Sequence, residues 1–313
     1  MLAKLTFCLA VLAAIAVPNA VASGGPLFVD VGGAGIVHGP TRFVPVVNNS
    51  GNDTTLEAIS AKDGTVGATL DLVGQWGVPA TAAGPEGISR DGSRLVLGDV
   101  ADGQTSPSLF FVVDPRRMRL VTPIALKGYF SFDALSPDAS KLYLIQYTRG
   151  GGDVSHYVVR AYDLRANRLL PGRVADRTQK SWVMEGYPIT RTTSADGRWV
   201  YTLYTNPSGY PFIHALDTVR GVAHCVGIPM ANQNGIYNIV LGLHGRTLSV
   251  HWRSGRPFVN VNTATWRVTP AHRGTFPWWA PAFLALVPLA LLLRRRRALA
   301  APRWFKARPV PGT

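Results

Sequence analysis

The feature that most constrains this chain is a short turn sequence that recurs four times, each time just before a strand-like run. Asp-Gly, Asp-Ala or His-Gly stands at its third and fourth positions, and these fourth positions are 47, 58 and 48 residues apart. Asp can hydrogen-bond the local backbone of a tight turn, and Gly accepts the positive φ that many turns require. The four copies are 89–92 before 94–97, 136–139 before 141–144, 194–197 before 198–201, and the degenerate 242–245 before 247–250.

A second hairpin pattern follows each of these turns. The pairs of alternating runs are 109–114 with 118–121, 157–163 with 168–170, 212–217 with 222–226, and 258–262 with 266–268. An earlier example joins 55–59 to 65–72 and is preceded by the strand-like run 43–47. Four short antiparallel strands in each repeat of roughly 40–50 residues are typical of a β-propeller blade. A β-sandwich built from the same short strands is the alternative.

The sequence Ser136-Pro137-Asp138-Ala139 and its relatives resemble the Ser-Pro-Asp-Gly turn of the WD-repeat-like and YVTN-type β-propellers. The resemblance covers about residues 42–269 and implies a propeller fold. It implies no particular activity, since the motif recurs in several propeller families. The chain departs from the pattern at 242–245 and in the longer interval of 58 residues, which contains Gly150–Gly152 and residues 174–180.

The hairpin spacing predicts an all-β propeller of about five four-stranded blades over residues 41–272. Six or seven blades also fit, because the segment 23–40 contains a strand-like run at 27–31. That run would complete a blade or supply a closing strand to the last one, and closure removes exposed sheet edges.

Both ends of the chain carry membrane signals. Residues 1–22 have a basic start, an apolar run and the small residues of a cleavage site, as in a signal peptide. Residues 273–293 contain an uncharged stretch long enough to cross a bilayer as one helix. The basic tail 294–313 follows, opening with Arg294, Arg295, Arg296 and Arg297. The positive-inside rule therefore predicts a single-pass protein with a cytoplasmic C-terminus and an extracytoplasmic propeller.

The net charge of +14 is concentrated at the C-terminal end. The tail holds seven Lys and Arg and no acids, and residues 23–293 carry only +6. A hydrophobic content of 47% excludes intrinsic disorder, and 32 Gly with 23 Pro disfavour a mainly helical fold. We therefore expect a mildly basic domain and a membrane anchor, not a nucleic-acid-binding protein.

Known catalytic motifs are absent from the sequence. There is no Gly-x-Ser-x-Gly, His-Glu-x-x-His, phosphate-binding Gly-rich loop with Lys, or Cys-x-x-Cys. The seven His residues show no close metal-ligand spacing, and neither a metal nor another cofactor is predicted. Cys225 remains alone once the signal peptide is removed, and its strand-like surroundings favour a structural role.

The position three residues before the Ser of each turn motif falls on the innermost predicted strand. It is occupied by Glu86, Asp133 and Arg191, whose side chains could line a central channel. Glu185 precedes a Gly-Tyr-Pro sequence that could lie at the mouth of that channel. Two or three carboxylates held close together could serve a hydrolase acting on a glycan or lactone. Glu86, Asp133 and Glu185 are therefore candidate catalytic residues, with polar strand ends as the alternative.

Aromatic residues near the predicted blade edges suit a ligand-binding or protein-binding rim, with core packing as the alternative. Together with Arg191, the candidate ligand-binding residues are Tyr129, Tyr187, Tyr210 and Tyr237. The favoured function is an exported, membrane-tethered propeller that binds a protein or glycan partner at its face. The alternatives are the propeller hydrolase and a non-catalytic envelope-assembly factor.

Overall fold

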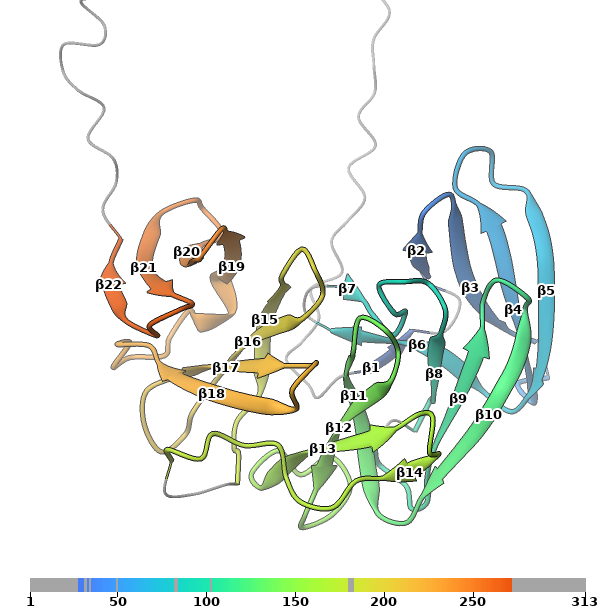
Figure 1. The fold of residues 1–313 in the computed structure, drawn as a ribbon, viewed down its shortest axis with the longest axis horizontal. Coiled ribbons are helices and arrows are strands. Elements are labelled where there is room, and N and C mark those ends of the chain that lie inside the picture. The colour runs from blue at the N-terminus through green and yellow to red at the C-terminus, as the bar shows by residue number, and fades with distance from the viewer. Residues whose placement is uncertain are drawn as a thin grey trace, which may run out of the picture.

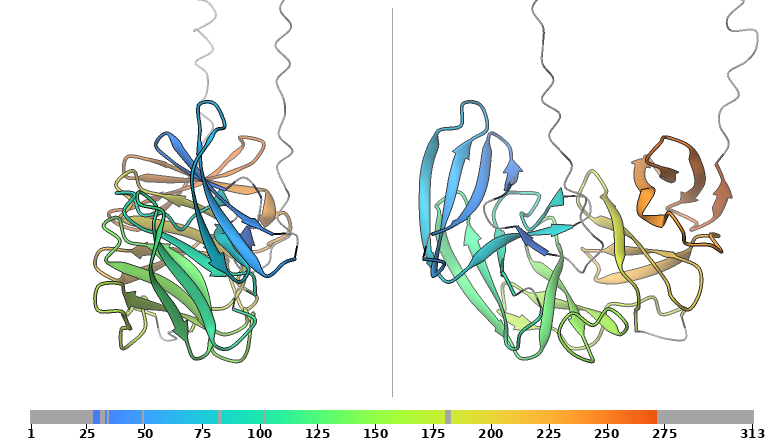
Figure 2. Two further views of the ribbon diagram at one scale, coloured as in Figure 1. Left: turned by 90° about the vertical axis from the view of Figure 1, so that its right-hand side faces the viewer. Right: turned by 180° about the vertical axis from the view of Figure 1, so that it is seen from behind.

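A computed structural model of the chain describes residues 28–30, 33, 35–48, 50–81, 84–101, 103–179 and 183–271. This part of the chain folds into five antiparallel sheets, four of them with four strands and one with six. The expected all-β class and the count of five are confirmed, and the two-sheet sandwich alternative is wrong. The sheets lie side by side along an arc, with the first and fifth at its two ends (Figures 1 and 2).

Four sheets are each made of strands that follow one another in the chain. Sheet 1 contains β2 (Ile36–His38), β3 (Thr41–Val47), β4 (Asp53–Ser60) and β5 (Val66–Val73). Sheet 3 contains β11 (Tyr129–Leu135), β12 (Lys141–Tyr147), β13 (Tyr157–Asp163) and β14 (Arg168–Leu169). Sheet 4 contains β15 (Pro188–Thr193), β16 (Trp199–Tyr204), β17 (Phe212–Asp217) and β18 (Val222–Gly227). Sheet 5 contains β19 (Ile239–His244), β20 (Thr247–Trp252), β21 (Pro257–Asn262) and β22 (Val268–Pro270), and the 3₁₀ turn η1 (Ile236–Asn238) precedes it.

Sheet 2 differs because the N-terminal strand joins it. Its strands are β1 (Phe28–Asp30), β6 (Trp76–Thr81), β7 (Gly84–Pro85), β8 (Leu95–Asp99), β9 (Ser108–Asp114) and β10 (Arg119–Leu126). The run at 27–31 was expected to complete a blade or close the last one. Instead, β1 pairs with β6, opposite residues 78–80, in a sheet that already has a full set of strands. The described residues show no pairing between sheets 1 and 5.

The recurring turn motif forms the same hydrogen-bonded structure in sheets 2, 3 and 4. In sheet 3, Ser136 Oγ donates to Asp138 Oδ1 over 2.9 Å and accepts from the Lys141 amide over 2.9 Å. The fourth residue of the motif has positive φ in all three sheets, including Ala139 at 52°. The side chains of the motif thus satisfy the backbone groups of the turn, which explains why this sequence recurs.

Strand ends differ from the sequence prediction where a residue takes a left-handed conformation. A last strand was expected to begin at Trp266, but Trp266 has φ of 60° and β22 begins at Val268. The Trp266 ring packs edge-on against Trp199 of sheet 4, with 5.5 Å between ring centroids. The Trp266 amide donates to the Asn262 carbonyl over 2.7 Å, so Trp266 ends the β21–β22 turn and does not start a strand.

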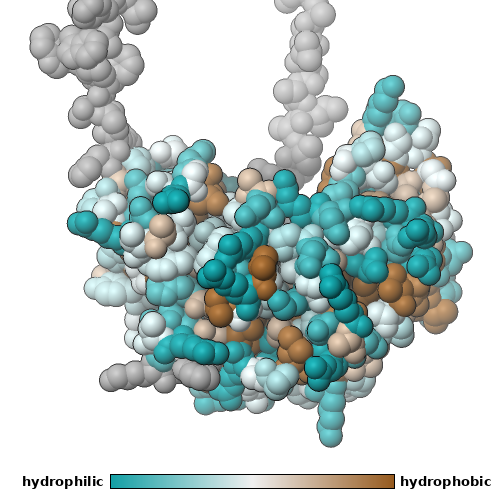
Figure 3. Space-filling view, in the orientation of Figure 1, coloured by the Kyte–Doolittle hydropathy of each residue, from teal (hydrophilic) through white to brown (hydrophobic). Residues whose placement is uncertain are grey.

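The hydrophobic core lies between neighbouring sheets. Leu56 of sheet 1 packs with Leu97 of sheet 2, and Phe110 of sheet 2 packs with Leu144 of sheet 3. Val159 of sheet 3 contacts the cluster that contains Leu216 of sheet 4, and Ile213 of sheet 4 clusters with Val250 of sheet 5. Each sheet between the ends of the arc therefore buries both of its faces. The outer strands β5 and β10 keep hydrophobic surface exposed at one side of the molecule (Figure 3).

Within the residues that the structure describes, no helix is long and apolar enough to cross a bilayer. The predicted signal peptide (1–22), spanning segment (273–293) and tail (294–313) lie outside the described residues.

The substitution Ser136→Ala tests the structural role of the turn motif. It removes the hydroxyl that accepts from the Lys141 amide and leaves that amide without its side-chain partner. We expect a loss of about 1–2 kcal/mol in the free energy of unfolding, measured by urea denaturation of the purified full-length chain. Ser254→Ala, at an exposed turn position, is the control and should change stability by less than about 0.5 kcal/mol. Equal stability of the two variants would contradict the role assigned to Ser136.

Candidate functional site

The structure brings three of the predicted channel residues together around one guanidinium group. Arg191 Nη1 lies 2.9 Å from Glu86 Oε2, and Arg191 Nη2 lies 2.5 Å from Asp133 Oδ1. Nη1 also donates to the Asp133 carbonyl oxygen over 2.5 Å, and Nε donates to Thr202 Oγ1 over 2.8 Å. Glu86 directly follows β7 of sheet 2, Asp133 lies in β11 of sheet 3 and Arg191 lies in β15 of sheet 4, so the group connects three sheets.

Burial differs between the two carboxylates. The side chains of Arg191 and Asp133 are each 2% exposed, whereas Glu86 is 23% exposed. Burial by itself would lower the pKa of Arg191, but the charges of Glu86 and Asp133 outweigh it and raise the pKa above its usual value. The guanidinium is therefore always charged, and it neutralises both acids.

Asp133 reaches Arg191 because it lies at a β-bulge. The pairing of β11 with β12 shifts between Phe132 and Ala134, which leaves Asp133 as the extra residue. A bulge redirects a side chain relative to its neighbours. Only Oδ1 of the Asp133 carboxylate contacts Arg191. Its Oδ2 is buried and has no hydrogen-bond partner among the described residues.

Arg191 is also the inner end of a polar row across one face of sheet 4. It stands opposite Thr202, which stands opposite His214, which stands opposite Cys225. Residues directly opposite in antiparallel strands project to the same face. Apolar residues on that face, such as Leu216, pack against sheet 3. The row therefore runs between sheets 3 and 4, from the innermost strand to the outermost.

A cavity of about 430 Å³ lies at the outer end of this row. Its walls come from the β12–β13 loop, the long connection between β14 and β15, the β16–β17 loop and the strands β17 and β18. Its polar and aromatic lining includes His156, Asp176, Glu185, Asn206, Tyr210, Phe212, His214 and Cys225. The volume is that of a pocket for a small ligand or for one or two side chains of a larger partner.

His214 and Cys225 are in contact but are not activated as a nucleophile and base. Cys225 Sγ lies 3.6 Å from His214 Nδ1. Burial raises the pKa of the Cys225 thiol to about 12 and lowers the pKa of His214 to about 4. At neutral pH the pair is therefore a protonated thiol and a neutral imidazole, not the thiolate that nucleophilic catalysis requires.

Asp176 lines one wall of the cavity, and both oxygens of its carboxylate already have partners. Oδ2 accepts from the Cys225 amide over 2.8 Å and lies 3.0 Å from His224 Nδ1, and Oδ1 accepts from Thr178. Burial would raise the pKa of Asp176, but these hydrogen bonds hold it below its usual value. In the part of the chain that the structure describes, no group of three or more His, Cys, Asp or Glu residues is placed to hold a metal ion.

The other predicted site residues lie near the strand ends that are farthest from the turn motifs. Glu185 and Tyr210 line the cavity, so Glu185 does not join Glu86 and Asp133. Tyr187, Tyr210 and Tyr237 are 37%, 56% and 56% exposed, as a binding rim requires. Tyr129 instead is half-buried against the cluster that contains Tyr147, Tyr157 and Tyr204.

Sequence reasoning did not identify His214, Cys225 and Thr202 as parts of one row. The signal that could have found them is strand register: His214 and Cys225 lie in the predicted strands 212–217 and 222–226, and Thr202 directly follows the predicted strand 198–201, so fixing the turns places the three opposite one another. Asp176 carried no such signal, since it lies in the irregular connection between β14 and β15.

No family model and no curated protein sequence matches the chain. Among solved structures, hydrazine synthase from Kuenenia stuttgartiensis is 14% identical with a TM-score of 0.41, over 85% of this chain and 62% of that one. BamB from Moraxella catarrhalis is 17% identical with a TM-score of 0.41, over 77% and 64%. TolB from Acinetobacter baumannii is 15% identical with a TM-score of 0.39, over 70% and 50%. The chain thus spans less than two thirds of each of these proteins, and at such TM-scores the similarities assign neither family nor function.

Replacing Arg191 tests the central ion-pair group. Arg191→Met leaves the buried Asp133 carboxylate uncompensated, and we expect it to lower the free energy of unfolding by about 3–5 kcal/mol. Glu86→Gln is the matched comparison and should cost much less, because Glu86 is partly exposed and its loss leaves Arg191 paired with Asp133. Urea denaturation of both full-length variants gives the two values. A cost below about 1 kcal/mol for Arg191→Met would show that the group does not hold the three sheets together.

Proposed function

We propose that the protein is an exported, membrane-tethered β-propeller that acts as a binding module, with its five sheets as the blades. The observation that carries this proposal is the state of the central carboxylates. Glu86 and Asp133 both pair with the guanidinium of Arg191, so neither is a free carboxylate, although Glu86 also lines a cavity of about 450 Å³.

This arrangement disfavours the alternative of a propeller hydrolase. Glycoside hydrolysis needs one carboxyl that donates a proton and a second carboxylate free to act as base or nucleophile. Asp133 is 2% exposed and shares its charge with Arg191, so it can approach no substrate. Glu185 lines the cavity beside β17 and β18, and neither Glu86 nor Asp133 lines that cavity.

The cavity between sheets 3 and 4 is the binding site that the geometry favours. It combines the Glu185 carboxylate and the Asn206 amide with the rings of Tyr210 and Phe212. Tyr210 is 56% exposed at its rim, and exposed aromatic residues beside a cavity are common anchors for a partner. We propose that a protein or glycan partner binds here.

The tether is supported by the sequence at both ends of the chain. The signal peptide at 1–22, the apolar segment 273–293 and the arginines at 294–297 together define a single-pass topology. In this topology the sheets lie outside the cytoplasm and the basic tail contacts anionic lipid head groups on the inner side.

Reporter fusions test the proposed topology in a bacterial host. Alkaline phosphatase is active only outside the cytoplasm, so it should be active when fused after residue 272 and inactive when fused after residue 313. A fluorescent protein that folds only in the cytoplasm should give the opposite pattern at the same two positions. Active phosphatase at residue 313, or inactive phosphatase at residue 272, would contradict the tether.

A hydrolysis assay distinguishes the proposed binding function from the alternative of a hydrolase. The purified full-length protein, offered a panel of 4-nitrophenyl glycosides and simple lactones, should release no product above that of Glu86→Gln. The reason is that Arg191 already holds both central carboxylates. Turnover by the wild type that Glu86→Gln abolishes would establish the hydrolase instead.

A further inference from the structure

The lining of the cavity between sheets 3 and 4 carries negative charge. Two of its lining residues, Asp176 and Glu185, are acidic, and no described Lys or Arg lines it. Arg177 follows Asp176 in the chain, but it is exposed and is not part of the lining. The lining His residues are His156 and His214, and His214 is uncharged at neutral pH because burial lowers its pKa to about 4. The charge of the lining therefore favours a cation over an anion.

Glu185 is the acid of this lining that is free to bind a cation. Asp176 already has hydrogen-bond partners for both of its carboxylate oxygens. The half-buried side chain of Glu185 has no hydrogen bond or ion pair with any other described residue. A carboxylate that gains a cationic partner forms charge-assisted hydrogen bonds, which are stronger than those between neutral groups. A cationic ligand would therefore find its strongest partner in Glu185.

The backbone holds Glu185 in place on both sides. The Met184 amide donates to the Tyr157 carbonyl over 2.8 Å, and the Met184 carbonyl accepts from the Tyr157 amide over 3.0 Å. On the other side, the Gly186 amide donates to the Val154 carbonyl over 2.9 Å. Glu185 thus lies between two residues that are tied to β13 and to the loop before it. A ligand need not order this segment when it binds, which lowers the entropic cost of binding.

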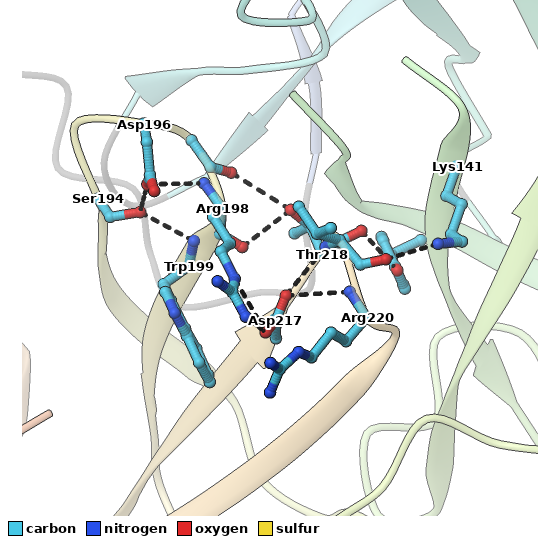
Figure 4. Close-up of polar contacts among 11 residues, drawn as sticks. Lys141, Ser194, Asp196, Arg198, Trp199, Asp217, Thr218 and Arg220 are labelled. Atoms are coloured by element: carbon cyan, nitrogen blue, oxygen red, sulfur yellow. Dashed lines mark hydrogen bonds and ion pairs between the residues drawn. The ribbon is translucent and has the colours of Figure 1, made fainter. Parts of the chain in front are cut away.

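The two sheets that form the cavity are joined at their far ends. Lys141 Nζ of sheet 3 donates to the Val219 carbonyl in the β17–β18 turn of sheet 4 over 2.6 Å (Figure 4). Nearby, Tyr143 Oη donates to the Thr218 carbonyl over 2.7 Å. The cavity is at the other ends of these strands, because the β12–β13 and β16–β17 loops line it. The spacing between sheets 3 and 4 is therefore fixed independently of any ligand.

The rest of the cavity wall combines aromatic rings with apolar side chains. The Phe212 ring stacks on Tyr204 with 5.4 Å between ring centroids, and Tyr210 is 56% exposed at the rim. Aromatic rings attract cations through their faces. The apolar lining residues are Ala175, Val183, Met184 and Phe212. Lys and Arg side chains carry a charged group on an apolar stem, so they suit a wall of this composition.

A buried polar group on the cavity wall independently indicates a ligand site. His214 lines the cavity and is 2% exposed, and its Nε2 is buried without a hydrogen-bond partner among the described residues. Buried polar groups rarely stay unpaired in native proteins. A polar ligand in the cavity can supply this partner, directly or through a water molecule that it orders.

We propose that this cavity binds a basic side chain of a partner protein, with the charged group on Glu185 and the alkyl stem against the apolar wall. The inference rests on the binding function proposed above and names the chemistry of the ligand. An amino sugar shares the ammonium group, but its ring carries hydroxyl groups that are costly to bury without hydrogen-bond partners. The apolar wall therefore favours the stem of Lys or Arg.

The probe is N-acetyl-lysine methylamide, titrated into the purified full-length protein and followed by saturation-transfer NMR. N-acetyl-norleucine methylamide has the same alkyl stem without the ammonium group. We expect the lysine compound to bind at least about fivefold more tightly, because it adds charge-assisted hydrogen bonds to Glu185. The corresponding arginine compound should also bind more tightly than the norleucine compound. Salt should reduce both differences.

Two matched variants assign the contact. Glu185→Gln keeps the shape of the side chain but removes its charge, and it should abolish the preference for lysine over norleucine. Glu57→Gln makes the same change on β4 of sheet 1 and should leave the preference unchanged. Glu185→Lys should reverse the preference, so that N-acetyl-glutamate methylamide binds more tightly than the lysine compound. Unchanged thermal unfolding of each variant shows that it is folded.

Equal binding of the lysine and norleucine compounds to the wild type would overturn the proposal, as would an unchanged preference in Glu185→Gln. If the norleucine compound bound equally well and Tyr210→Ala weakened it, the cavity would remain a binding site and only its preference for a cation would be wrong. No binding of any probe would contradict both the cation preference and the proposed site. Methyl glucosaminide that binds as tightly as the lysine compound, and depends on Glu185, would assign the cavity to amino sugars and overturn the protein partner.

Discussion

One buried guanidinium group determines how the middle of this molecule is assembled. Arg191 forms ion pairs with two acids from outside its own sheet, and the neighbouring strand β16 supplies Thr202 as a further partner. A buried charge is tolerated only when such partners surround it. The hydrophobic contacts between the sheets are not directional, so the ion pairs fix how sheets 2, 3 and 4 face one another.

Many of the acidic residues of the chain have structural roles. Seven of the 18 acidic residues serve as turn caps and two more pair with Arg191, so half of the negative charge is used to build the fold. Among the basic residues, Arg191 and Arg198 have comparable structural roles, whereas others remain exposed. A repeated turn that requires Asp thus sets the spacing of the strands and takes up much of the negative charge of the chain.

The sequence was sufficient for the fold and for part of the site. The spacing of the turns predicted the sheet count, because the turns are local and repeat along the chain. Counting back from the motif Ser placed Glu86, Asp133 and Arg191 on the innermost strands as residues that could line a channel, and the structure brings the three together as an ion-paired group. The placement of Glu185 failed because it follows a long irregular connection whose path depends on tertiary packing. The pairing of β1 with β6 could not be predicted either. A three-residue strand with no turn signal beside it does not indicate which strand it pairs with or in which register.

The position of β1 has a consequence for the order in which the chain folds. Sheets 1, 3, 4 and 5 are built from consecutive strands, so each can form as soon as its own segment is complete. β1 is the first described strand in the chain, yet its partner β6 follows only after the whole of sheet 1. β1 therefore has no strand partner until β6 is available, after the last strand of sheet 1. The pairing of β1 with β6 thus links a strand that precedes sheet 1 to the sheet that follows it.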